Sequence, residues 1–110
     1  MALAYEFTCE LSMEEMLEIL NKKGPWKWTM HDSHWYGDYL NCRPEEDVRV
    51  RIHHPAEFFY GITHHPEDRY TALFTIEFKA AAARDTVDHI FHELLAHLQA
   101  RNLCEIEYYD

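Results

Sequence analysis

The segment LAYEFTCELSMEEMLEILNKKGP, residues 3–25, decides the fold class because its hydrophobic period changes partway along. Up to residue 11, apolar and polar side chains alternate, which predicts a strand with one buried face. From Ser12 onward the apolar residues recur at helical spacing, with Ser12 as N-cap and Glu15 as its capping-box partner. Gly24 then ends the helix. The chain therefore begins with a strand followed by a helix.

Several strands and a second helix are predicted after this start. Alternation indicates strands at residues 26–30, 36–42, 48–52 and 69–79, with a weaker one at 58–62. The second helix is expected over residues 82–101, with Asn102 as a left-handed cap. The last strand, from Cys104, is expected to direct Cys104, Ile106 and Tyr108 inward.

This order of elements favours one α+β domain over residues 1–110. We expect a two-layer sandwich, with two helices on one face of a mostly antiparallel sheet, in a broadly ferredoxin-like arrangement. A split βαβ plan needs an even number of strands between its helices, whereas five candidates are counted. Either the segment at 58–62 is not a strand or the sheet is mixed.

Composition narrows the class of partner. Twenty acidic and ten basic residues give a formal charge of −10, which disfavours direct nucleic-acid or membrane binding and favours a basic partner or simple solubility.

No signal peptide or membrane span is recognised, so we expect a cytoplasmic protein. Three glycines and no phosphate-binding loop predict no nucleotide cofactor, and three cysteines without Cys-x-x-Cys spacing predict reduced thiols.

The tripeptide His-His-Pro occurs at residues 53–55 and again at 64–66. Proline cannot donate to a strand ladder and keeps the preceding residue extended, so both motifs are expected at strand ends. If residues 58–63 run antiparallel to 48–53, the motifs lie roughly 20 Å apart. A single metal ion cannot bridge that distance.

One rim of the predicted sheet gathers polar side chains. Centring the turn between Cys42 and Val48 pairs Leu40 with Val50, Asp38 with Ile52 and Tyr36 with His54, all on the core side. Asp38, Tyr36 and His54 would then gather at this rim. Such a set suits general acid–base chemistry, and the preceding turn would add His31 and His34. No metal site is predicted; His31, His34 and His54 are only weak candidates for metal ligands. The structural alternative, that Asp38 and His54 only satisfy each other's hydrogen bonds, is favoured over catalysis.

The opposite face of the sheet offers a different kind of surface. Trp35 and Tyr39 alternate with Tyr36 and Asp38, so they should face away from the core, beside Arg51 and His53. Exposed aromatics next to arginine are typical of protein interfaces. The outer strands of the sheet are expected to add acidic residues to this same face. The candidate partner-binding residues are Trp35, Tyr39, Arg51, Glu105 and Glu107.

Three functional hypotheses follow. The first is a small acidic cytoplasmic protein-binding module of inhibitor, immunity or decoy type, with a protein partner that the charge suggests is basic. The alternative is a small-molecule or metal-dependent site at the rim, in a homodimeric ferredoxin-like enzyme. A third is a homodimer whose exposed strands extend the sheet.

In the second helix, His89, Glu93 and His97 recur every four residues and are interpreted as a solvated face.

Overall fold

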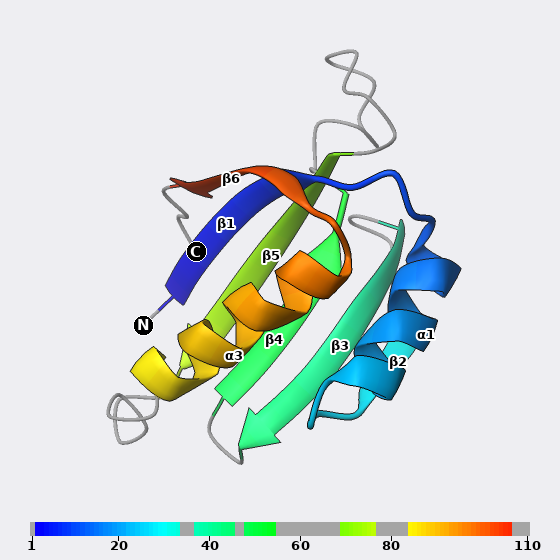
Figure 1. Ribbon diagram of the computed structural model, residues 1–110. Helices are drawn as coiled ribbons and strands as arrows, with labels where there is room; N and C mark the ends of the chain where they lie inside the picture. The colour runs from blue at the N-terminus through cyan, green and yellow to red at the C-terminus, as the bar shows by residue number, and fades with distance from the viewer. Residues whose placement is uncertain (1, 34–36, 46–47, 55–68, 77–83, 107–110) are drawn as a thin grey trace.

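Six antiparallel strands form one open sheet in the computed structural model, which describes residues 2–33, 37–45, 48–54, 69–76 and 84–106. The sheet has the strand order β2-β3-β4-β5-β1-β6 (Figure 1). The strands are β1 (Ala2–Thr8), β2 (Trp28–Ser33), β3 (Gly37–Glu45), β4 (Val48–His53), β5 (Arg69–Ile76) and β6 (Arg101–Ile106).

Helices α1 (Met13–Lys23) and α3 (Arg84–His97) lie on the same face of this sheet (Figure 1). The predicted α+β class, with two helices on one face, is therefore confirmed. The ferredoxin-like arrangement is not observed, because the sheet has six strands and a different order. Four strands, an even number, separate the two helices in the described part of the chain, and residues 58–62 lie outside it.

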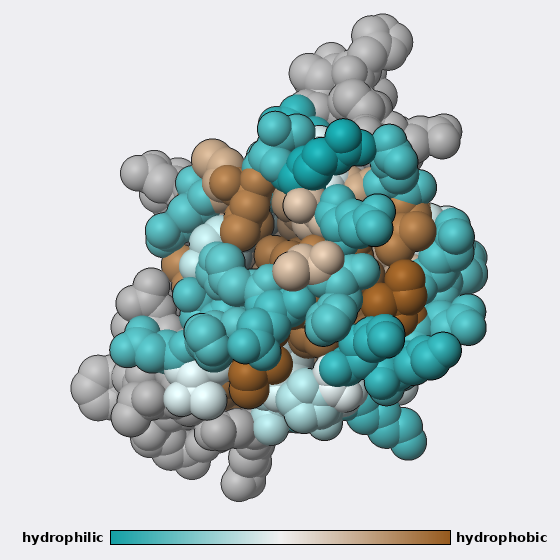
Figure 2. Space-filling model, viewed as in Figure 1, coloured by the Kyte–Doolittle hydropathy of each residue, from teal (hydrophilic) through white to brown (hydrophobic). Residues whose placement is uncertain are grey.

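The core fills the space between the helices and the sheet. Its fully buried side chains come from both layers: Phe7, Phe91, Met16, Leu20, Leu40, Ile52, Leu94, Leu98, Val48 and Val50. Seen from the helix side, hydrophilic residues cover most of the surface and apolar atoms appear only between them (Figure 2). Neither described helix is long and apolar enough to cross a membrane.

The start of α1 has the predicted capping box. The Glu15 amide donates to Ser12 Oγ at 3.2 Å, and the Ser12 amide donates to Glu15 Oε1 at 3.0 Å. These hydrogen bonds from Ser12 lower the pKa of the Glu15 carboxyl. The Gly24 amide donates to the Leu20 carbonyl at 3.1 Å and ends the helix, as expected.

Helix α3 is shorter than predicted at its C-terminal end. Gln99 has a left-handed backbone, with φ of 56°. The Ala100 amide donates to the Leu95 carbonyl and the Gln99 amide to the Ala96 carbonyl, both at 3.1 Å. This is the Schellman pattern of a helix end. The predicted helix over 82–101 is therefore wrong at its end, and Arg101 already belongs to β6.

The register of β3 against β4 also differs from the prediction. Leu40 lies opposite Ile52, and a bulge occurs between Cys42 and Glu45. The predicted partner of Leu40 was Val50, so the register is displaced by two residues. Because side chains alternate between faces at every residue, a displacement of two changes the partners and keeps the faces.

The predicted inward direction of Cys104 is wrong. Cys104 is exposed and lies opposite Glu6, on the face away from the helices. The register shifts between Glu6 and Thr8, which lies opposite Arg101. Asn102, within this irregular stretch, has φ of 57°. It has the predicted left-handed backbone, but it lies within a strand bulge and does not cap a helix.

Candidate functional site

The face of the sheet turned away from the helices, called here the open face, carries a polar row that crosses all six strands. Directly opposite residues in neighbouring strands share a face. Successive strand pairings therefore align His31, Tyr39, His53, Thr71, Glu6 and Cys104. The next row contains Asn41, Arg51 and Leu73.

The aromatic part of the open face is at the β2–β3 end. The rings of His31 and Tyr39 stack with centroids 5.6 Å apart and an interplanar angle of 29°. Thr29 Oγ1 lies 2.9 Å from His31 Nε2. Tyr39 also lies opposite His53 on its other side, where the predicted register would have placed Arg51. Trp35, the other predicted aromatic, lies outside the described residues.

Arginines dominate the charge of the open face on β4, β5 and β1. The alternation of side chains places Arg49, Arg51 and Arg69 there, together with a single acidic residue, Glu6. Arg69 forms an ion pair with Glu6. Arg49 Nε donates to Asn41 Oδ1 at 2.7 Å, which orients this guanidinium across β3. On the described parts of β4, β5 and β1, this face therefore carries three arginines and one glutamate.

His53 is the buried histidine of this face, with 7% of its surface exposed. Its Nδ1 lies 2.7 Å from the His54 carbonyl and must therefore carry the proton. Burial lowers the pKa of His53, and the nearby positive charges of Arg51 and His54 lower it further. His53 is held as a neutral side chain.

The predicted rim residues have different surroundings from those expected. The His54 ring stacks on Tyr70 at 4.6 Å, and its Nδ1 lies 3.0 Å from the Arg69 carbonyl. Tyr70 is buried and donates to the Leu11 carbonyl at 2.9 Å. Asp38 is exposed and lies opposite Asp32. Tyr36 lies outside the described residues, and the described contacts of His54 are typical of a structural histidine.

The metal candidates do not converge in the described part of the chain. His31 lies on the open face, whereas His54 stacks on Tyr70 in the core on the opposite face. His34 lies outside the described residues. Among the described residues, no three His, Cys, Asp or Glu side chains are grouped so that they could hold a metal ion.

The acidic part of the predicted partner surface is also divided. Glu105 lies opposite Tyr5, on the helix side of the sheet, because the bulge at Asn102 changes which face each β6 residue occupies. It was expected on the face of Glu6. Glu107 lies outside the described residues. Tyr39 and Arg51 therefore share the open face, and Glu105 does not.

A hydrogen-bonded cluster between β1 and α3 was missed by the sequence analysis. The Tyr5 hydroxyl donates to Asp88 Oδ1 at 2.7 Å. His92 Nδ1 lies 2.8 Å from the Asp88 carbonyl, and its ring meets Tyr5 edge-on at 5.4 Å. The four-residue spacing of Asp88 and His92 was the available signal. By contrast, His89 and Glu93 form an exposed pair at 3.2 Å, consistent with the solvated face predicted for this helix.

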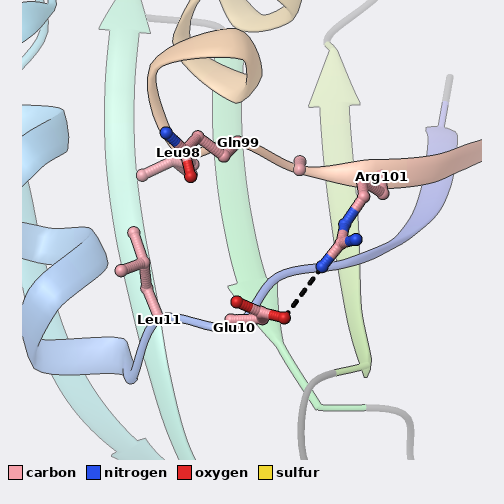
Figure 3. A pocket seen from close by; sticks show the side chains of 6 residues that line it. Glu10, Leu11, Leu98, Gln99 and Arg101 are labelled. Atoms are coloured by element: carbon pink, nitrogen blue, oxygen red, sulfur yellow. Dashed lines mark hydrogen bonds and ion pairs between the residues drawn. The ribbon is translucent and has the colours of Figure 1, made fainter.

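Two hollows occur on the described surface. One, of about 560 Å³, lies where the β1–α1 and α3–β6 connections meet; Leu11 and Leu98 line it, and Arg101 Nη2 lies 2.9 Å from Glu10 Oε1 at its edge (Figure 3). The other, of about 480 Å³, lies on the β5–β1–β6 part of the sheet. Its lining is Glu6, Phe7, Thr8, Arg69, Asn102, Cys104 and Ile106.

The second hollow extends the open face beyond the arginines. It contains the Arg69–Glu6 ion pair, so the described open face has an aromatic end at β2–β3 and a hollowed end at β5–β1–β6. Such a surface can recognise a partner by shape and charge. No protein-family model matches the chain, and a search of the curated proteins finds no match for it.

Proposed function

We propose that this chain is a protein-binding module that uses the open face of its sheet as the contact surface. The observation that carries the proposal is the stacked His31–Tyr39 pair beside Arg49 and Arg51, on the face opposite α1 and α3. Tyrosine and arginine are enriched at the energetic centres of protein interfaces. An exposed histidine stacked on tyrosine adds apolar contact area to the same patch.

The contact residues are ordered before any partner binds. Tyr39 and Arg49 belong to strands paired on both sides. The Nε of Arg49 donates a hydrogen bond to the Asn41 side chain, and the Thr29 hydroxyl contacts the His31 ring. Ordering a long side chain at an interface costs about 0.5–1.5 kcal/mol. Side chains that are already held lose less freedom on binding, which supports recognition by this face.

A small cytoplasmic protein of inhibitor, immunity or decoy type fits this description. Such a protein acts by covering a surface of its partner and needs no catalytic group of its own. The part of the face that suits this purpose is the β2–β3 end and the adjoining part of β4, where His31 is exposed and Tyr39 and Arg49 are partly exposed.

Capture from the host lysate with paired variants tests the proposal. The double variant His31→Ala/Tyr39→Ala removes the stacked pair, and Glu18→Ala/Lys22→Ala changes exposed residues of α1 on the opposite face. Circular dichroism establishes that both variants are folded. We expect a partner protein whose recovery falls at least tenfold, or about 1.4 kcal/mol, with the first variant and not with the second. Equal losses, or none, would reject the open face.

A further inference from the structure

We propose that the hollow between the β1–α1 and α3–β6 connections, called here the junction hollow, binds a free α-amino acid with an apolar side chain. Its lining comes from both connections and the start of β6: Glu10, Leu11, Leu98, Gln99, Ala100 and Arg101. Its volume of about 560 Å³ lies within the range of about 300–1,000 Å³ that is typical of small-molecule sites. None of these residues belongs to the His31–Tyr39 patch, so the proposal is independent of the protein-binding function.

The inner part of the junction hollow is apolar. Leu98 is 1% exposed and belongs to the core, and Leu11 is partly buried against that core. In Figure 3 the two leucine side chains point toward one another from opposite sides of the hollow. A branched apolar side chain that lies between them would be removed from water on both sides, which favours its binding.

The edge of the junction hollow carries one positive and one negative group, and their mutual contact leaves most of their hydrogen-bonding capacity unused. Among the described residues, the Arg101 guanidinium contacts Glu10 through Nη2 alone, at 2.9 Å from Oε1. A guanidinium has five N–H donors and a carboxylate has two oxygens. The Arg101 and Glu10 side chains are 68% and 80% exposed, so the remaining donors and the second oxygen are accessible to a ligand.

These two charges favour a zwitterion over a simple ion. A carboxylate alone would bind Arg101 but would be repelled by Glu10 and by a chain of formal charge −10. An ammonium alone would bind Glu10 but would be repelled by Arg101. An α-amino acid carries both groups on one carbon, through two bonds of about 1.5 Å each, so its carboxylate can bind the guanidinium while its ammonium binds the Glu10 carboxylate. Helix α3 ends directly before Leu98, and the partial negative charge of a helix C-terminus also favours the ammonium.

The test uses L-leucine and two analogues, each of which lacks one of its charged groups. 4-Methylpentanoate has no ammonium, and 3-methylbutylamine has no carboxylate. Binding to the full chain is followed through backbone amide chemical shifts. We expect leucine to shift the amides of residues 10–11 and 98–101, and each analogue to bind at least fivefold more weakly. Glycine, which lacks the apolar side chain, should also bind at least fivefold more weakly than leucine.

Substitutions with matched changes of charge locate the site. Glu10→Gln and Arg101→Gln each remove one charge at the junction hollow, whereas Glu18→Gln and Arg43→Gln remove exposed charges elsewhere. We expect each of the first two variants to weaken leucine binding at least fivefold, and each of the second two to change it less than twofold. An exposed ion pair contributes little to stability, so we expect the variants to fold, and circular dichroism establishes that they do.

Three results would overturn the assignment. Binding of either analogue as tight as that of leucine would mean that the hollow does not recognise a zwitterion. Equal effects of the hollow and control substitutions would mean that leucine binds elsewhere. Absence of shifts at about 20 mM leucine, where even millimolar sites are mostly occupied, would show that the hollow holds no free amino acid. Each of these results leaves the test of the protein-binding function unaffected, because the His31→Ala/Tyr39→Ala variant changes neither connection.

Discussion

At the scale of single residues, His53 shows how the sheet constrains a titratable side chain. It lies between Tyr39 and Thr71 in neighbouring strands and is 7% exposed. Desolvation lowers its pKa from the ordinary value of 6.5. The unfolded chain therefore binds a proton at a higher pH than the folded chain does. Stability contributed by this residue is complete above pH 6.5 and is lost as the pH falls below that value.

Replacing His53 by asparagine tests this linkage. The asparagine amide can still donate to the His54 carbonyl, but it does not titrate. We expect the difference in free energy of unfolding between pH 7.5 and pH 5.0, measured with urea, to be smaller in the variant than in the wild type. His89→Asn is the control, because the His89 side chain is 76% exposed. An unchanged difference in His53→Asn would show that His53 is not held neutral by the fold.

The three cysteines should differ in reactivity because only one is accessible. Burial raises the pKa of the Cys42 thiol to about 12, Cys9 is also buried, and Cys104 is exposed. Since the thiolate is the reactive species, we expect one thiol per chain to react rapidly with Ellman's reagent at pH 8 and all three to react in urea. Cys104→Ser should remove the rapid phase; a rapid phase that persists would contradict the described position of β6.

At the scale of elements, the end of α3 contains a residue type that is unfavourable for its backbone conformation. Gln99 has φ of 56° at the position where helices prefer glycine. We expect Gln99→Gly to raise the free energy of unfolding by about 0.5–1 kcal/mol, because glycine has no Cβ to clash in the left-handed region. Ala96→Gly, at an exposed position within the helix, should instead lower it by about 1 kcal/mol. Destabilisation by both would show that Gln99 is not left-handed in solution.

The contact between α1 and α3 depends on the absence of a side chain at Gly24. A Cβ there would lie 2.5 Å from Leu94 Cδ2 and 3.1 Å from the Leu20 carbonyl oxygen. The φ of −105° is accessible to alanine, so a substitution tests packing and not backbone strain. We expect Gly24→Ala to destabilise the protein by about 1–3 kcal/mol in urea unfolding. In a Leu94→Ala background the added cost should be clearly smaller; additive costs would mean that the two residues do not touch.

The elements also show which parts of the structure the sequence could predict. Period and capping located α1 and the four inner strands, β1, β3, β4 and β5, because those signals are local. The bulges between Cys42 and Glu45 and at Asn102 were not predicted, since one extra residue leaves composition and alternation nearly unchanged. Tyr39 and Arg51 were still placed on one face, because a displacement of two residues preserves faces. Glu105 was predicted on the wrong face, because one extra residue in a bulge moves the following side chains to the opposite face of the sheet.

At the scale of the whole molecule, charge is divided between the two sides. The helix layer carries exposed acidic side chains, among them Glu14, Glu18 and Glu93. The central open face carries Arg49 and Arg51. Net charge alone could not reveal this division.

Stability should likewise be unevenly distributed over the sheet. β1 is hydrogen-bonded on both sides, to β5 and β6, and Leu3, Tyr5 and Phe7 on it are buried. β6 is an edge strand in which residues 101–105 are all exposed. β2 is the opposite edge, but Trp28 on it is buried and is held by the Asn21 side chain through hydrogen bonds of 2.7 and 3.1 Å. Edge strands with little buried surface open at low free energy.

Hydrogen exchange followed by mass spectrometry measures this distribution directly. We expect peptides from residues 101–106 to exchange at least tenfold faster than those from residues 2–8, with residues 28–33 between them, because opening β6 exposes little apolar surface whereas opening β1 disrupts the core. Protection of β6 equal to that of β1 would contradict this ranking. It would mean that the outer edge of β6 is covered in solution, as it would be if a second copy extended the sheet, and dilution should then restore rapid exchange.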